Sequence, residues 1–190
     1  MNNHEQALRP IFAMNAGKSL QLLSAVYGYR ERGQEVMLFT AAIDDRSGVG
    51  KISSRVGISA EAHVFRQDTK FSLDMLSEGI ECVFVDESQF LTEEQVRDLH
   101  RLANTEGGVP VMCFGLRTDF RGLPFPGSAM LMCLADDIAE VKTACKCGRK
   151  ASMNIRLNED GSRVREGAQI EIGGNARYDS VCSGCFYRGE

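Results

Sequence analysis

The sequence lacks an excess of positive charge, a long apolar run, and a basic start followed by an apolar segment. Its 22 lysines and arginines are outnumbered by 26 aspartates and glutamates, so the formal net charge is −4. No overall positive field therefore draws the chain towards nucleic acid or an anionic membrane. The longest apolar stretches, residues 109–116 and 129–135, are shorter than the roughly 18 to 20 residues that span a bilayer. The opening MNNHEQALRP does not resemble a signal peptide, and we expect a cytoplasmic protein.

Internal repeats and low-complexity segments are also absent from the sequence. Its 190 residues are enough for one domain with a sizeable core plus a small appendage. Short apolar runs predict buried strands at residues 36–41, 80–86, 109–115 and 129–135. Helical patterns predict helices at residues 18–32, more weakly at 69–78, and from a capping box at Thr92 to Gly107. Strands that alternate with helices are typical of a parallel sheet covered by helices.

Two segments depart from this alternation. Residues 44–60 are rich in glycine and serine with basic residues between them, and we expect a mobile loop there. Residues 144–190 are rich in cysteine, glycine and arginine, with only short strand-like pieces. The sequence therefore predicts an α/β domain over residues 1–143 and a small second domain over residues 144–190.

The segment FAMNAGKS, residues 12–19, ends in the Gly-Lys-Ser of the phosphate-binding pattern G-x-x-x-x-G-K-[ST]. In that pattern, backbone N–H groups surround the phosphates, the lysine meets the β and γ oxygens, and the hydroxyl contacts Mg²⁺. A chance Gly-Lys-Ser at the start of a helix is the alternative. The predicted ATP-binding residues in this loop are Phe12, Ala13, Met14, Asn15, Ala16, Gly17, Lys18 and Ser19.

Two residues depart from the usual phosphate loop. Phe12 stands in place of the first glycine, at a position whose backbone conformation often disfavours a side chain. Pro10 lies where the strand before the loop should run, and proline cannot donate a hydrogen bond to a sheet. A weakened or inactive nucleotide-binding protein is therefore an alternative to an active one.

The segment VFVDESQF places Asp86 and Glu87 at the end of a buried strand, the edge at which α/β proteins bind ligands. Asp86, together with Ser19, is predicted to hold Mg²⁺, and Glu87 is the candidate general base for an attacking hydroxyl. A solvated Asp-Glu turn that caps the next helix is the alternative. A glutamate in this position could equally activate water in an ATPase.

Four of the seven cysteines form two close pairs, Cys145-x-Cys147 and Cys182-x-x-Cys185. Four thiolates suit a tetrahedral zinc ion, and such an ion would fold a segment too small for a core of its own. Unrelated reduced thiols are the alternative. The other three cysteines lie singly in apolar runs and are interpreted as small core residues: Cys82, Cys113 and Cys133.

Several segments combine into one pattern along the chain. They are MNAGKS (14–19), the AxIDDR stretch ending at Arg46, VDESQF (85–90), GLRTDFRGLPF (115–125), the paired cysteines and EIGGNARYDSVC (171–182). With this combination the chain resembles the cellular-type (type II) thymidine kinases, and most closely their bacterial branch. The resemblance extends over nearly the whole chain after residue 11.

The resemblance implies a RecA-like P-loop fold whose zinc-binding domain carries a lasso loop. It implies transfer of the γ-phosphate of ATP to the 5′-hydroxyl of thymidine, giving dTMP, with Glu87 as the base and Lys18 at the phosphates. Arg46 would neutralise charge on the transferring phosphoryl group. Three further residues belong to the nucleotide-binding segment of Glu87: Asp86, Ser88 and Gln89.

The resemblance also implies a pocket for thymine, closed by the lasso at residues 170–178. The residues that it assigns to this pocket are Phe90, Leu116, Phe120, Phe125, Ile170, Ile172, Gly174 and Tyr178. For the aromatic residues, core packing is the alternative. Family members form homotetramers and are inhibited by dTTP, which we expect here. Rival functions are a P-loop ATPase, which would not need thymidine, an inactive homologue, and a zinc-ribbon nucleic-acid adaptor.

Overall fold

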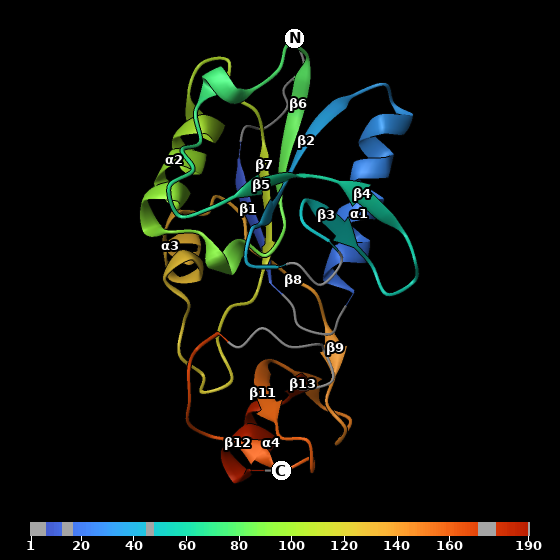
Figure 1. Ribbon diagram of the computed structural model, residues 1–190, viewed down its shortest axis with the longest axis vertical. Helices are drawn as coiled ribbons and strands as arrows, with labels where there is room; N and C mark the ends of the chain where they lie inside the picture. The colour runs from blue at the N-terminus through green and yellow to red at the C-terminus, as the bar shows by residue number, and fades with distance from the viewer. Residues whose placement is uncertain (1–6, 13–16, 45–47, 171–177, 190) are drawn as a thin grey trace.

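The computed structural model describes residues 7–12, 17–44, 48–170 and 178–189. Its centre is a six-stranded sheet in the order β5-β2-β6-β7-β1-β8, in which all neighbours run parallel (Figure 1). The strands are β1 (Leu8–Phe12), β2 (Glu35–Ala41), β5 (His63–Phe65), β6 (Ile80–Val85), β7 (Val111–Gly115) and β8 (Ala139–Glu140). The predicted parallel sheet is confirmed, and so are its predicted strands at β2, β6 and β7.

Helices cover both faces of this sheet (Figure 1). They are α1 (Lys18–Glu31) on one face, and α2 (Glu93–Asn104) and α3 (Pro126–Leu134) on the other. Successive side chains of β6 point to opposite faces of the sheet. Phe84 packs in one cluster with Leu22 of α1, whereas Val85 packs in another with Leu99 of α2. Burial on both faces explains why the central strands are apolar at successive positions.

β1 is present although Pro10 lies at its centre. The carbonyl oxygens of Leu8 and Phe12 accept hydrogen bonds from the N–H groups of Asp136 and Val141, on the β8 side. Residues two positions apart in a strand direct their backbone groups to the same side. Pro10 lies two positions from both Leu8 and Phe12, so its missing N–H would also face the β8 side. There β8 pairs only with the last two residues of β1. The proline is tolerated because no neighbouring strand needs its hydrogen bond.

α2 begins at the predicted capping box. Thr92 Oγ1 accepts from the Gln95 N–H at 3.2 Å, and Gln95 Oε1 accepts from the Thr92 N–H at 2.9 Å. The Gln95 amide also donates to the carbonyl oxygens of Arg66 and Thr69, which ties the turn after β5 to the helix. The helix ends at Asn104, before the predicted Gly107.

The prediction of a strand at residues 129–135 is wrong, because these residues belong mostly to α3. Pro126 occupies the first position of that helix, where its fixed φ and missing N–H favour a helix start. The helix is apolar because it packs against the core, with Leu131 fully buried. A short apolar run cannot be assigned to helix or strand from periodicity alone.

The segment predicted as a mobile loop contains a β-hairpin of β3 (Lys51–Ser53) and β4 (Ser59–Glu61). Ile52 in β3 is 2 % exposed and packs with the core under α1, which anchors the hairpin. Residues 45–47 lie outside the described part of the chain. The weak helix predicted at residues 69–78 is reduced to one 3₁₀ turn, η1 (Leu73–Met75).

The C-terminal residues form a separate small lobe, coloured orange to red in Figure 1. It contains the hairpin β9 (Thr143–Ala144) and β10 (Lys150–Ala151), a three-stranded antiparallel sheet, and α4 (Ser183–Arg188). The sheet has the order β12-β11-β13, with β11 (Met153–Leu157), β12 (Arg163–Val164) and β13 (Tyr178–Val181). The predicted boundary at residues 143 and 144 falls inside β9 and stays a prediction.

No helix in the described ranges is both long enough and apolar enough to cross a membrane.

Candidate active site

The carboxyl ends of parallel strands bring two distant segments together. α1 follows β1 and begins at Lys18, and Gly17 before it has φ 72° and ψ 29°. This left-handed conformation is one that glycine adopts without strain. Asp86 and Glu87 directly follow β6. Because the carboxyl ends of parallel strands lie at one edge of the sheet, the lysine and the two carboxylates meet there.

Lys18 lies between the two acidic side chains. Its Nζ is 2.9 Å from Glu87 Oε1 and 3.6 Å from Asp86 Oδ1. The Ser19 hydroxyl donates to Asp86 Oδ2 at 3.2 Å. Lys18, Asp86 and Glu87 are all buried, so these charges interact with little screening by water. The structure thus brings together the predicted base, the predicted phosphate-binding lysine and the two predicted magnesium residues.

Glu87 has a strained backbone. Its φ of 52° and ψ of 37° are left-handed, and it is the only residue other than glycine with a positive φ among those that the structure describes. Such conformations cost free energy and concentrate at functional sites. The turn that follows is the 3₁₀ helix η2 (Ser88–Phe90).

η2 packs closely against the end of β7. The Gln89 amide nitrogen donates to Glu87 Oε2, and Gln89 Oε1 accepts from the Leu116 N–H at 3.0 Å. A Cβ on Gly115 would lie 2.5 Å from Ser88 Oγ and 3.0 Å from the backbone nitrogen of Gln89. Only glycine allows this approach. Sequence reasoning missed Gly115, because its requirement comes from a neighbour on another strand.

Burial raises the pKa of Asp86 above its ordinary value, and the Lys18 ammonium group only partly opposes this. The Asp86 carboxylate and the Ser19 hydroxyl are oxygen donors, the type that Mg²⁺ prefers. Their separation of 3.2 Å fits a shared contact with one hydrated ion. The donor set is therefore suitable for magnesium.

Phe12 packs in the core on the α2 and α3 face, and is 5 % exposed. It also lines a small pocket with Leu116 and Arg117. Its side chain thus lies on the face opposite α1. Several predicted site residues lie outside the described residues: Ala13, Met14, Asn15, Ala16, Arg46, Ile172 and Gly174.

A cavity of about 490 Å³ opens between the ends of β2 and β5, η2 and the start of α3. Phe90 and Phe125 line it, in edge-to-face contact with ring centroids 6.1 Å apart, and so do Gln89 and Ile170. Leu116 lines the smaller pocket beside Phe12. Phe120 and Tyr178 are not among the residues that line the larger cavity. The structure thus brings together only part of the predicted thymine pocket.

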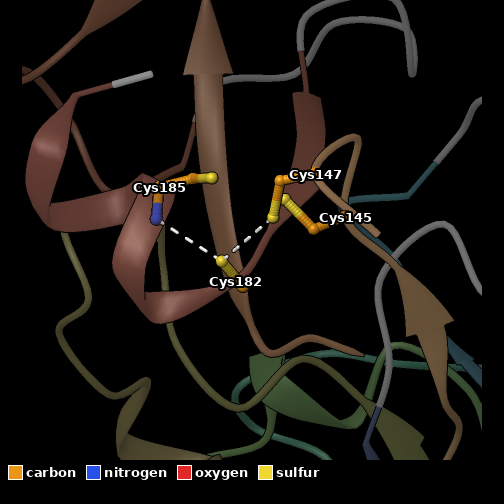
Figure 2. Close-up of side chains that lie close together, drawn as sticks. All are labelled: Cys145, Cys147, Cys182 and Cys185. Atoms are coloured by element: carbon orange, nitrogen blue, oxygen red, sulfur yellow. Dashed lines mark hydrogen bonds between the residues drawn. The ribbon is translucent and has the colours of Figure 1, made fainter. Parts of the chain in front are cut away.

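The four paired cysteines converge in the C-terminal lobe, and their side chains point towards one another (Figure 2). Their sulfur atoms all lie within 4.8 Å of one another. One pair lies in the β9–β10 turn, where Gly148 has a φ of 83°, and the other lies at the start of α4. Four thiols in such a cluster can hold one tetrahedral metal ion such as zinc. Of the three other cysteines, Cys82 and Cys113 are buried as predicted, but Cys133 is exposed on α3.

Two arginines surround this cluster. Arg149 Nε donates to Cys147 Sγ at 3.5 Å, and Arg188 Nη2 donates to Cys185 Sγ at 3.4 Å. Hydrogen bonds from Arg149 lower the pKa of Cys147 to about 6. Metal-binding thiols must be deprotonated, so Arg149 favours the form of Cys147 that binds metal.

Comparison with known proteins places the chain in one family. The family model described as "Thymidine kinase" matches residues 10–186. A protein named thymidine kinase from Chromobacterium violaceum is 54 % identical over 175 residues, which cover 92 % of this chain and 94 % of the relative. The thymidine kinase of Albidiferax ferrireducens is 54 % identical over 92 % of this chain and 88 % of its own length. That of Idiomarina loihiensis is 51 % identical, over 90 % of both chains.

Proposed function

The chain belongs to the thymidine kinase family, and we propose that it transfers the γ-phosphoryl group of ATP to the 5′-hydroxyl of thymidine, giving dTMP. The observation that carries the proposal is the buried contact of 2.9 Å between Lys18 and Glu87. It places a phosphate-binding cation and a candidate base in one site. The rival ATPase and inactive homologue are not favoured, since the named relatives are thymidine kinases.

In the proposed mechanism, Lys18 binds the β and γ phosphate oxygens of ATP. Glu87 accepts the proton of the 5′-hydroxyl, and its other oxygen is held by Gln89. Ser19 and Asp86 would hold Mg²⁺, which would neutralise charge on the phosphates. Lys18 and Glu87 pair with each other in the free site.

The remaining assignments rest on the family. Arg46 stabilises charge on the transferring group, and residues 13–16 surround the phosphates. The thymine pocket uses the cavity beside Phe90 and Phe125. Residues 170–178 close over it as a lasso, with Ile172 and Gly174 in its middle and Tyr178 at its end. We further propose a homotetramer in the cytoplasm that dTTP inhibits.

We also propose that Cys145, Cys147, Cys182 and Cys185 hold a structural zinc ion. The sulfur cluster supports this assignment, and the lobe has a small apolar core that includes Ile155 and Phe186. Bonds from the four cysteine sulfurs to zinc would compensate for the small size of this apolar core.

The test is phosphorylation of radiolabelled thymidine by wild type and by Glu87→Gln, with ATP and Mg²⁺. Wild type should form dTMP, and the variant should lose about 10²-fold or more in kcat, because the amide cannot accept the proton. The control is Glu94→Gln, an exposed position on α2 that should not change the rate. Equal rates in the two Glu variants would exclude Glu87 as the base. ADP formation that does not depend on thymidine would favour an ATPase.

A further inference from the structure

Arg156 is a buried cation in the C-terminal lobe. It lies in β11 and is 4 % exposed. Its guanidinium carbon is 3.9 Å from the centroid of the Phe120 ring, and Phe120 itself is 1 % exposed. A cation on an aromatic face binds more strongly when water is excluded. Arg156 therefore fixes Phe120, which sequence reasoning assigned to the thymine pocket, from the opposite lobe.

The same guanidinium holds the stem of the lasso, which we define as residues 166–169. Its Nη1 donates to the Ala168 carbonyl at 3.0 Å and its Nη2 to the Glu166 carbonyl at 3.4 Å. Gly167 lies between these carbonyls with a φ of 133°, and a Cβ there would be 2.5 Å from Arg156 Nη2. Glycine at this position is thus required by both the backbone conformation and the close approach of Arg156.

A second contact ties the stem to the loop that carries Phe120. Gln169 Nε2 donates to Asp119 Oδ2 at 3.3 Å and to the Pro124 carbonyl at 3.4 Å. Asp119 Oδ1 in turn accepts the N–H groups of Arg121 and Leu123, both at 2.9 Å, which gives the loop its shape. Stem and loop therefore form one connected unit.

Arg156 also lies next to the other end of the lasso. In the antiparallel pairing of β11 with β13 it is directly opposite Tyr178. Directly opposed residues of such a pair project from the same face of the sheet. The Arg156 cation thus contacts Phe120 and the stem, and its residue lies opposite Tyr178 at the end of the lasso.

We propose that Arg156 is a positioning residue that holds the stem, residues 166–169, against Phe120 and so sets the affinity for the nucleoside. The proposal rests on the proposed thymidine kinase activity. Lys18 and Glu87 take no part in these contacts. The effect of Arg156 is therefore expected in the KM for thymidine, with the KM for ATP and kcat little changed.

The experiment compares steady-state kinetics of wild type, Arg156→Met and Arg163→Met in the full chain with metal. Arg156→Met should raise the KM for thymidine about tenfold, because it removes a buried cation-π contact and two charge-assisted hydrogen bonds. Arg163→Met is the matched control, since Arg163 makes a similar contact with Phe186 at 4.2 Å in the same lobe. It should leave the KM for thymidine within about twofold, because its contacts lie at α4.

Gly167→Ala is the second variant, and it keeps the arginine. Its Cβ should displace the guanidinium and raise the KM for thymidine in the same way. Arg156→Lys should recover only part of the loss, because lysine lacks the planar fork that reaches two carbonyls. Calorimetric titration of thymidine into each protein measures the same change without turnover.

The outcomes separate the two proposals. An active wild type with an unchanged thymidine KM in folded Arg156→Met and Gly167→Ala would overturn the role of Arg156 and leave the kinase assignment intact. A similar rise in Arg163→Met would also overturn it, since the effect would then be general loosening of the lobe. A wild type that neither binds nor phosphorylates thymidine would overturn both proposals.

Discussion

Among single residues, Asp86 combines a proposed magnesium-binding position with a cost in stability. It is 4 % exposed, and burial raises its pKa above that of the unfolded chain. A carboxyl group with a raised pKa contributes stability at low pH that is lost as the pH rises through its folded-state pKa. At a pH above its folded-state pKa, ionised Asp86 therefore opposes folding of the free protein. This cost is consistent with the magnesium role that we propose for Asp86.

We expect Asp86→Asn to melt at a temperature at least equal to that of wild type at about pH 8, with the difference shrinking towards about pH 5. The same variant should lose about 10²-fold or more in thymidine phosphorylation, because a neutral amide holds Mg²⁺ poorly. Calorimetry and a kinase assay check the two effects. Asp74→Asn, at an exposed position in η1, is the control and should change neither. A variant clearly less stable than wild type at both pH values would contradict this account of Asp86.

Among the elements, η2 depends most on a neighbour that is distant in the sequence. It begins at the strained Glu87, and Gln89 connects it to Leu116. Gly115 at the end of β7 leaves the space in which Ser88 lies. The orientation of the candidate base is thus set by the packing of a 3₁₀ turn against a different strand.

Gly115→Ala is expected to displace η2 and to destabilise the protein by about 1–3 kcal/mol, as overpacking in a core does. Because the displaced turn carries the candidate base, kcat should fall as well. Denaturant unfolding and steady-state kinetics measure these effects. Gly28→Ala is the matched control, because its Cβ would meet only the end of the Arg32 side chain in a helix that alanine favours. Unchanged kcat in Gly115→Ala would show that η2 tolerates the shift.

Elements differed in how well the sequence predicted them. α2 was predictable because its capping box is a local feature. α3 was mistaken for a strand because its apolar residues reflect burial, which both kinds of element can have. The hairpin of β3 and β4 was missed because Ile52, which anchors it, is a single apolar residue among glycines and serines.

At the scale of the whole molecule, two separate apolar clusters lie against the main sheet, and a third lies within the C-terminal lobe. The third contains Cys145, Cys182 and Cys185 together with Ile155 and Phe186. We expect a core this small to depend on the proposed zinc ion for stability. The lobe also carries β11 and β13, and hence the proposed lasso contacts.

Removal of the metal with a chelator should therefore unfold the C-terminal lobe and abolish thymidine binding, whereas the main sheet stays folded and still binds ATP. Limited proteolysis locates the unfolded part, and calorimetric titrations with ATP and thymidine follow the two sites. Restoring zinc should restore thymidine binding. If binding of ATP and of thymidine were lost together, the two lobes would form one cooperative unit. If neither were lost, the metal would have no structural role.

The sequence by itself determined which groups are present: the Gly-Lys-Ser of the phosphate loop, the acidic pair after β6 and the four paired cysteines. These were recognisable because the chemistry needs fixed residue types at short, fixed spacings. The tertiary structure decided which distant groups meet, such as Lys18 with Glu87, Gly115 with Ser88, and Arg156 with Phe120. It also placed Phe12 in the core, and Pro10 where β8 does not extend along β1. These outcomes depend on packing between segments far apart along the chain, which no local pattern encodes.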